Sequence, residues 1–291
     1  MNETVKTIAE DREHGASELA RHCLAVLAER TQTSTASSHT DFITELNALA
    51  EALRQARPSM APIQNLVGCW QSRLSHHAEQ EIGALRDNMR AYAHELGDCS
   101  RQAVTAIAQQ TQALISAHAT VMTHSLSSTV VAAFKALKNH QVSAIVTESR
   151  PLQEGYRLAQ QLSAWGIPAM LITDAQMGLF AGQTNAILVG ADTLFGDGSV
   201  LNKAGTFLLA LAAHRQNVPF YVASETFKRV STSPLQAPLE EQAAEELGLT
   251  ALSGVTVRNL YFDITPPDLV SAYITEQGIY RQAAQLPFFA P

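Results

Sequence analysis

The sequence predicts an α/β protein with a helical N-terminal domain, residues 1–116, followed by a Rossmann-like parallel-sheet domain, residues 117–291. Two observations support this prediction. Before Ser116 the chain is rich in Ala, Glu, Gln, Arg and Leu, with apolar residues at helical spacing. After Ser116 short apolar runs alternate with helical patterns. This alternation is typical of βαβ units, because parallel neighbouring strands need a connection long enough to hold a helix.

Composition narrows the class of protein. A chain of 291 residues with 46% hydrophobic and 16% charged residues can bury a full core. Its formal net charge of -7 gives no bulk attraction to nucleic acid or to an anionic membrane, so neither is expected as a partner, although a local basic pocket can still bind a small anion. The polar start, Met1 to Arg12, lacks the apolar core of a signal peptide, and no long apolar run follows. We therefore expect a cytoplasmic protein.

In the helical half, apolar side chains recur every three or four residues. The Ser/Thr-rich stretch from Thr31 to Thr40 is typical of a loop. Arg57 before Pro58 predicts a helix end, because a residue that precedes proline avoids the α region. The clearest apolar series are Leu19, Cys23, Val26 and Leu27, and then Leu46, Leu49 and Leu53.

The three cysteines are far apart in the sequence and make no close pair of metal-ligand type. Buried, inert thiols are the favoured interpretation of Cys23, Cys69 and Cys99. The ten histidines likewise form no array that resembles a metal site, so no metal ion is expected.

Five strands are expected in the C-terminal half, each a short apolar run that ends in polar residues. They cover residues 119–123, 144–148, 169–174, 186–190 and 220–223, with helices over about 128–138, 155–164 and 205–215. The alternation predicts a doubly wound sheet. No G-x-G-x-x-G follows the first strand, which argues against a nicotinamide dinucleotide, and no cofactor is expected.

Polar and charged residues follow each of these strands. In an open parallel sheet, ligands bind beyond the carboxyl ends of the strands, so these residues form one candidate site. Arg150 and Lys228 supply cations, and helices that begin near Ser127, Gly155 and Gly205 supply positive dipole ends, a combination that suits a phosphate. The full set is Thr123-His124-Ser125, Thr147-Glu148-Ser149-Arg150-Pro151, Asp174, Gly190-Ala191-Asp192 and Ser224-Glu225-Thr226-Phe227-Lys228.

The carboxylates in this set have two interpretations each. Asp192 follows a fully apolar strand, where a desolvated carboxylate can act as a general acid or base; the alternative is a helix cap or an ion pair. Glu148 and Glu225 either contact substrate or hold a loop by pairing with the neighbouring cations, Arg150 and Lys228.

Two segments lie between the fourth and fifth expected strands. Gly196-Asp197-Gly198 has the composition of a turn. Asn202-Lys203 leads toward a helix, where Lys203 either contacts a ligand or, as is more common for a lysine at a helix start, is exposed.

Taken in order, these segments resemble a known family. The run Gly190-Ala191-Asp192, then Asn202-Lys203-x-Gly205-Thr206, then Pro219 to Ala223 with Glu225 and Lys228, is similar to the central signature of the initiation factor 2B alpha/beta/delta and sugar-phosphate isomerase family. Its arginine-proline segment resembles residues 147–151 with Gly155, and its C-terminal motif resembles residues 262–267 and 274–279. The resemblance is close from about Val121 to Ile279.

The helical half resembles the family more weakly. His14-Gly15-Ala16 resembles an R-G-A phosphate motif in which the arginine is replaced, and Arg57-Pro58-Ser59 resembles an R-P-T/S motif. The family resemblance implies a sugar-phosphate pocket between the two domains and a homo-oligomer, usually a dimer.

Isomerase members of this family use a catalytic pair, a cysteine in a T-H-C segment and the aspartate of G-A-D. The pair moves a proton between C1 and C2 of an aldose that carries phosphate on C1. Ser125 and Asp192 occupy those two positions here and are the expected catalytic residues. The expected substrate-binding residues are Arg150, Lys228, Asn202, Lys203, Gly15 and Arg57.

The serine at position 125 leaves two functions open. A thiol with a pKa near about 8.5 can be tuned into a base, whereas a serine hydroxyl needs an activating partner, for which His124 is the candidate. One function is an isomerase of a phosphorylated pentose, which the retained Asp192 favours because regulatory members often carry glutamate there. The other is a non-catalytic protein that binds a phosphorylated pentose or a nucleotide, or a scaffold subunit that resembles the regulatory initiation factor 2B subunits, which also lack the cysteine.

Overall fold

The structure is a computed structural model that describes residues 3–77, 79–237, 239–249 and 253–289. The chain divides into two compact units, one of residues 1–103 with 289–291 and one of residues 104–288. The domain limits expected at residues 116 and 117 stay a prediction, and residues 1–2 and 290–291 of the expected domains lie outside the described residues.

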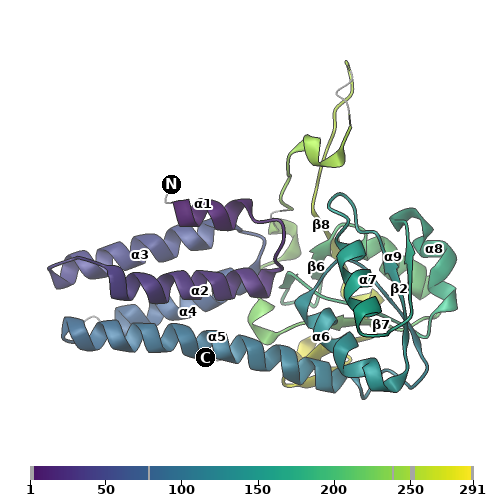
Figure 1. Cartoon of the computed structure of the whole chain (residues 1–291), viewed down its shortest axis with the longest axis horizontal. Coiled ribbons are helices and arrows are strands. Elements are labelled where there is room, and N and C mark those ends of the chain that lie inside the picture. Colours follow the sequence, from purple (N-terminus) through teal and green to yellow (C-terminus); the bar gives the residue numbers. More distant parts are fainter. Residues whose placement is uncertain (1–2, 78, 238, 250–252, 290–291) are drawn as a thin grey trace. The chain divides into compact units, whose positions relative to one another are not determined.

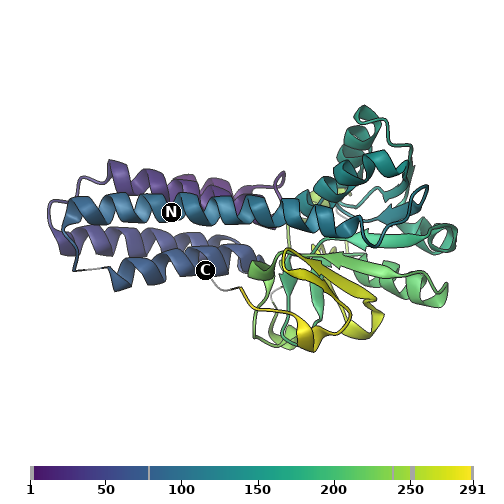
Figure 2. The same cartoon turned by 90° about the horizontal axis from the view of Figure 1, so that it is seen from below.

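Helices build the first unit. Helices α2 to α5 lie side by side with similar axis directions (Figures 1 and 2). Most of the apolar series found in the sequence is buried: Leu19, Leu27, Leu46 and Leu53 have no exposed surface, whereas Val26 is half-buried. The helices are α1 (Glu3–Glu10), α2 (Ala16–Thr33), α3 (His39–Ala56), α4 (Ala61–His76) and α5 (Ile82–Thr111), the last of which continues into the second unit.

Two expectations for the helical half need correction. The loop expected from Thr31 to Thr40 is shorter, because α2 continues to Thr33 and Ser38 caps the next helix by accepting a hydrogen bond from the Asp41 backbone N–H at 3.1 Å. Cys23 is buried, which raises the pKa of its thiol to about 12, but Cys69 is half-buried and Cys99 is exposed. Cys99 is exposed because it lies on a face of the long helix α5 that no other part of the described structure covers.

A seven-stranded sheet forms the centre of the second unit. Its strand order is β10-β9-β7-β4-β1-β2-β3, and all neighbours are parallel except β10 and β9. All five expected strands are present, which confirms the α/β fold class. The strands are β1 (Thr120–Thr123), β2 (Ser143–Thr147), β3 (Ala169–Ile172), β4 (Ala186–Val189), β7 (Phe220–Ala223), β9 (Ala272–Thr275) and β10 (Gly278–Tyr280).

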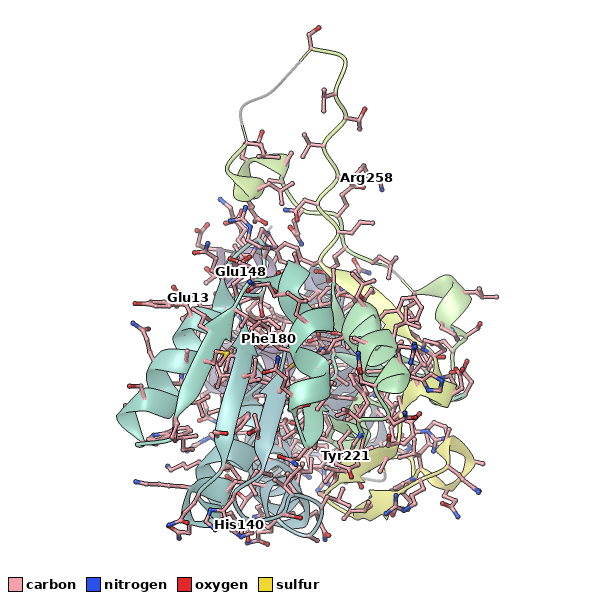
Figure 3. The ribbon with its side chains drawn as sticks, turned by 90° about the vertical axis from the view of Figure 1, so that its right-hand side faces the viewer. Glu13, His140, Glu148, Phe180, Tyr221 and Arg258 are labelled. Carbon is pink, nitrogen blue, oxygen red and sulfur yellow. The ribbon has the colours of Figure 1, made fainter. Side chains whose placement is uncertain are left out.

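Helices connect these strands, and an apolar core lies on each face of the sheet. Val121 and Leu188 belong to one core, whereas Met122 and Ile187 belong to the other, as expected when successive side chains of a strand point to opposite faces. The helices are α6 (Ser128–Leu137), α7 (Glu154–Ala164), α8 (Met177–Phe180) and α9 (Thr206–Arg215). In Figure 3, Phe180 at the end of α8 lies in front of the sheet.

A small antiparallel sheet was not predicted. Strand β6 (Val200–Lys203) lies between β5 (Thr193–Leu194) and β8 (Phe262–Thr265). It places Asn202 and Lys203 on a buried strand, so the expected exposed lysine at a helix start is wrong. The expected turn at residues 196–198 joins β5 to β6.

Short 3-10 helices fill the connections of the second unit. They are η1 (Lys138–His140), η2 (Asp174–Gln176), η3 (Ala181–Gln183), η4 (Thr226–Lys228), η5 (Pro234–Gln236), η6 (Ala244–Leu247), η7 (Pro267–Leu269) and η8 (Ala283–Gln285).

The order of the strands creates one switch point. From β1 the chain moves to β2 and β3 on one side, and then returns to β4 on the other side of β1. A parallel sheet binds ligands at such a point, beyond the carboxyl ends of the two central strands. Figure 3 shows Glu148, after β2, at one end of the strands and His140, before β2, at the other.

Candidate functional site

Ser125 and Asp192 follow the two strands that flank the switch point. Strands β1 and β4 are parallel, with Val121 beside Ala186 and Met122 beside Ile187, so both strands end at the same edge of the sheet. The loops that follow the two strands lie close together: a Cβ atom added to Gly190, after β4, would be 2.4 Å from the Oγ of Ser127, after β1. Asp192 is half-buried, and its backbone N–H donates to the Leu201 carbonyl at 2.9 Å.

Two serines at this edge adopt an unusual backbone conformation. Ser125 has φ of 69° and Ser149 has φ of 62°, a left-handed region that residues other than glycine seldom occupy. The Ser125 backbone N–H donates to the Ser149 Oγ at 2.8 Å. The Asp174 carboxylate accepts from the backbone N–H groups of Ser149 and Arg150, both at 2.8 Å. Asp174 therefore holds the loop after β2, and residues kept in such strained conformations often belong to functional sites.

The hydrogen bonds described for the His124 ring join it to groups other than Ser125. The ring is buried; its Nε2 lies 2.9 Å from the Ala204 carbonyl and its Nδ1 lies 2.6 Å from the Thr147 Oγ1. A carbonyl only accepts, so Nε2 carries a proton, and Nδ1 of the neutral ring accepts from the Thr147 hydroxyl. Burial lowers the pKa of His124, although the nearby Asp174 charge acts in the opposite direction. Both nitrogens of the neutral imidazole are thus engaged by other groups, which argues against His124 as the base that serves Ser125.

Arg150 and Lys228, the two expected phosphate cations, differ in their surroundings. Arg150 is exposed, and its Nη2 donates to the Leu247 carbonyl at 2.9 Å. The Lys228 Nζ is buried and lies 2.9 Å from Oε2 of Glu225, which is itself fully buried. Glu225 therefore pairs with Lys228, which is the second of the two interpretations given for Glu225 from the sequence.

A further carboxylate, Glu276, lies beside this pair and was not identified from the sequence. It accepts hydrogen bonds from the backbone N–H and the hydroxyl of Thr226, which lies between Glu225 and Lys228. Burial raises the pKa of Glu276, and the nearby charge of Glu225 raises it further against the hydrogen bonds from Thr226. The edge beyond β7 therefore holds two carboxylates and one ammonium.

Asn202 and Lys203 are both buried on β6. The Asn202 amide donates to the Thr206 Oγ1 at 3.0 Å, and the Thr206 hydroxyl donates to the Lys203 carbonyl at 2.6 Å. The Lys203 Nζ lies 2.8 Å from Oε1 of Glu154 and 4.2 Å from the centre of the Tyr261 ring. The sequence analysis identified neither Glu154 nor Tyr261; a glutamate in the first turn of a helix, like Glu154, usually only favours the helix dipole.

The three expected helix starts are not equivalent. The Asp263 carboxylate accepts from the backbone N–H groups of Gly205 and Phe207, so the start of α9 already carries an anion. The Gly155 N–H at the start of α7 donates to the Glu148 carbonyl at 3.2 Å. By contrast, α6 begins after Ser127, whose side chain makes no capping hydrogen bond. Of these three helices, α6, which begins shortly after Ser125, is therefore the one whose N-terminal backbone N–H groups are best suited to bind an anion.

Gly15 and Arg57 belong to the first unit. Gly15 is the residue before α2, and its carbonyl accepts from the Glu18 and Leu19 N–H groups at 3.0 Å each. The buried Arg57 donates to the Asp11 carbonyl at 3.0 Å, so it lies against the loop that leads to Gly15. Their place in one site with residues of the second unit stays a prediction.

Asp11 also holds His14, which replaces the arginine of the R-G-A motif. Its carboxylate lies 2.8 Å from the His14 Nδ1 and accepts from the His14 backbone N–H at 2.8 Å. Burial acts to raise the pKa of Asp11, but the hydrogen bonds from His14 and Glu13 lower it overall. His14 is therefore engaged in the local structure of this loop.

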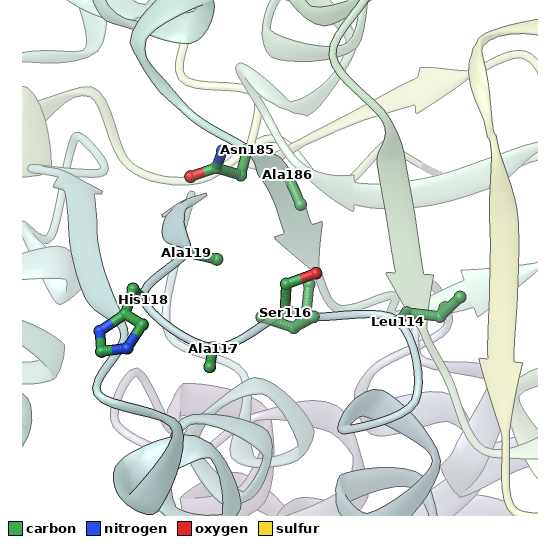
Figure 4. Close-up of a pocket in the computed structure, with 8 residues that line it drawn as sticks. Leu114, Ser116, Ala117, His118, Ala119, Asn185 and Ala186 are labelled. Atoms are coloured by element: carbon green, nitrogen blue, oxygen red, sulfur yellow. The ribbon is translucent and has the colours of Figure 1, made fainter.

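Two hollows of the second unit lie at the opposite, amino edge of the sheet. One, of about 130 Å³, is lined by residues 114–119 with Asn185 and Ala186, at the starts of β1 and β4 (Figure 4). The other, of about 350 Å³, lies at the starts of β7 and β9 and includes His214 and Asp268. Neither is lined by an expected site residue.

Two features are absent from residues 3–77, 79–237, 239–249 and 253–289. These residues contain no helix that is both long enough and apolar enough to cross a membrane. They also contain no cluster of three or more His, Cys, Asp or Glu side chains arranged to hold a metal ion.

Known proteins resemble this chain over nearly its whole length. Residues 12–282 match the model of the initiation factor 2 subunit family. A crystal structure of the translation initiation factor eIF-2B of Pyrococcus horikoshii OT3 superimposes with a TM-score of 0.84 and 34% identity, covering 98% of each chain. The ribose 1,5-bisphosphate isomerase of Archaeoglobus fulgidus is 33% identical over 273 residues, 91% of this chain and 84% of that one.

A second isomerase is also similar. The methylthioribose-1-phosphate isomerase of Albidiferax ferrireducens is 36% identical over 221 residues, 69% of this chain and 62% of that one. Relatives of this chain thus include both sugar-phosphate isomerases and eIF-2B-like proteins. Since the family model spans nearly the whole sequence, this chain belongs to the initiation factor 2 subunit family.

Proposed function

We propose that this chain binds a phosphorylated pentose at the carboxyl edge of its parallel sheet, at the switch point between β1 and β4. The observation that carries the proposal is the placement of Ser125 and Asp192 at the ends of these two adjacent parallel strands. The loops at this edge also carry Ser149, whose backbone is strained like that of Ser125, the start of α6 and the cation Arg150, and Lys203 is next to Ala204, whose carbonyl accepts from His124. Relatives named as isomerases of ribose 1,5-bisphosphate and methylthioribose 1-phosphate suggest the class of ligand.

The roles of these groups follow from their chemistry. The N–H groups at the start of α6 and the cationic side chains of Arg150, Lys203 and Lys228 bind the phosphate, with Asn202 in a supporting role. Asp192 accepts a hydrogen bond from a hydroxyl of the sugar.

Thermal unfolding with ribose 1,5-bisphosphate, methylthioribose 1-phosphate and AMP tests the proposal. A ligand at a hundred times its dissociation constant stabilises a fold by roughly 2.7 kcal/mol. We expect both sugar phosphates to raise Tm, with a smaller rise for AMP. An Arg150→Ala variant should lose most of the rise, whereas Arg281→Ala, which removes an exposed arginine near β10, should keep it. No rise with either sugar phosphate would contradict the proposal.

A second candidate function is isomerisation of the bound sugar. Asp192 favours it, because a half-buried carboxylate beside the sugar can carry the proton between C1 and C2. The engaged ring of His124 disfavours it, because the ring is then not available to ionise the Ser125 hydroxyl. We therefore expect binding to exceed catalysis in this chain.

Ketose formation followed by NMR separates the two candidates. Wild-type protein should bind ribose 1,5-bisphosphate with little turnover, and Ser125→Cys should increase turnover by restoring a thiol that can ionise. A Ser125→Ala variant serves as the matched control and should bind without turnover. Rapid turnover by the wild-type protein would establish the enzyme and overturn this assignment of Ser125.

A further inference from the structure

A buried ion pair joins helix α7 to strand β6. The Glu154 Oε1 and the Lys203 Nζ are 2.8 Å apart, and only 12% and 7% of their side-chain surfaces are exposed. The Tyr261 ring contacts the same ammonium, with its centre 4.2 Å from Nζ. Burying a lone ammonium is costly, and the carboxylate offsets that cost. The ammonium is therefore held by a charge and by an aromatic face.

The backbone of each partner of the pair packs on or pairs with a neighbouring element. Glu154 precedes Gly155, where a Cβ would lie 1.7 Å from the Thr147 carbonyl oxygen, so the first turn of α7 packs directly on the end of β2. Lys203 pairs with Phe262 in the small sheet, and the next residue, Ala204, donates to the Tyr261 carbonyl at 2.8 Å. Independent elements thus fix the carboxylate, the ammonium and the ring.

The pair lies close to the switch point. The Ala204 carbonyl, one residue after Lys203, accepts from the His124 ring, which directly precedes Ser125. An ammonium has three N–H donors, and Glu154 is its one hydrogen-bonding partner among the described contacts. The remaining donors are suited to an anion at this edge.

We propose that Glu154 is a positioning residue, whose carboxylate, together with the Tyr261 ring, holds the Lys203 ammonium where it binds the phosphate of the ligand. This inference rests on the proposed function. Glu154 then has two opposing effects on binding: its negative charge repels the phosphate, whereas its contact with Lys203 places the ammonium for the phosphate. The role is favourable only if the gain from fixing the ammonium exceeds that repulsion.

Two substitutions separate position from charge. Glu154→Gln removes the charge but keeps an oxygen that accepts from the ammonium, whereas Glu154→Ala removes both. If Glu154 positions Lys203, calorimetric titration with ribose 1,5-bisphosphate should show Kd unchanged or lower for Glu154→Gln and raised about tenfold or more for Glu154→Ala. If Glu154 acts only through its charge, both variants should bind more tightly, which would overturn the proposal.

A double-mutant cycle with Lys203→Met tests whether the effect passes through Lys203. In the Lys203→Met background, Glu154→Ala should cause no further loss of affinity; a full additional tenfold loss would contradict the positioning role. Urea unfolding of each variant first verifies that it folds.

A reading independent of the ligand comes from the rate at which acetic anhydride acetylates Lys203, followed by mass spectrometry. The rate should rise several-fold in Glu154→Ala, because the ammonium then loses both the charge and the hydrogen-bond acceptor that hold it. An unchanged rate in Glu154→Ala would overturn the positioning role even if ligand binding is confirmed. If the wild-type protein binds no sugar phosphate and the acetylation rates still follow this pattern, the proposed function fails while the hold of Glu154 on Lys203 stands.

Discussion

Asp263 makes the stability of this protein depend on pH in a predictable direction. Its side chain is half-buried at the start of α9, and this burial raises its pKa from the ordinary 3.8 to about 6, although the N–H groups of Gly205 and Phe207 act against the rise. A raised pKa means that the folded state holds the proton more tightly than the unfolded state. The stabilising contribution is therefore fully present below the ordinary pKa and is lost as pH rises through about 6.

The pKa difference sets the size of the effect. A difference of about two pKa units corresponds to about 3 kcal/mol between the protonated and the ionised carboxyl group. Between pH 7 and pH 5 the expected gain is about 1 kcal/mol, because the carboxyl group in the unfolded chain stays ionised over that range. An Asp263→Asn variant keeps an oxygen that caps α9 but has no proton to gain.

Urea unfolding of the wild-type protein and of Asp263→Asn at pH 7, 6 and 5 measures this contribution. We expect the free energy of unfolding of the wild-type protein to rise relative to that of the variant by about 1 kcal/mol as pH falls from 7 to 5. His124 titrates in the opposite sense, because its pKa is lowered, but it is present in both proteins and cancels in the difference. Parallel stability curves for the two proteins would refute the reasoning.

Other predictions concern packing and assembly. Gly155→Ala should destabilise the second unit by about 3 kcal/mol or more in urea unfolding, because the new Cβ would clash with a backbone oxygen, whereas Gly68→Ala, which meets nothing within 4 Å inside α4, should stabilise the fold by up to about 1 kcal/mol. Gly190→Ala should cost about 1–3 kcal/mol, since the Ser127 side chain must move. Leu53→Ala should destabilise the helical unit by about 2–5 kcal/mol. Light scattering should give the mass of a dimer, and a monomer at micromolar concentration would contradict the expected homo-oligomer.

The main sheet was predictable because its strands carry their signal locally. Residues 186–189 are apolar and buried throughout, as strands covered on both faces must be, and the expected limits were within two residues of those observed. The small sheet was missed for the opposite reason. Its central strand, Val200–Lys203, includes an amide and a lysine, and the buried lysine is accommodated by Glu154 and Tyr261 elsewhere in the chain.

The candidate site was predictable as a set of strand ends and unpredictable in its pairings. Strand order alone brings Ser125 and Asp192 to the same edge. The sequence does not show that Asp263 occupies the start of α9, because the two segments are more than fifty residues apart. It also suggested His124 as a partner of Ser125 because they are adjacent, whereas the ring bonds instead to Thr147 and Ala204.

The central claim is that a phosphorylated pentose binds where β1 and β4 end. A crystal structure of the protein with ribose 1,5-bisphosphate tests it most directly. We predict ligand density in contact with Ser125 and Asp192, with a phosphate at the start of α6. Density confined to the amino edge, for example in the hollow lined by residues 114–119, would contradict the account.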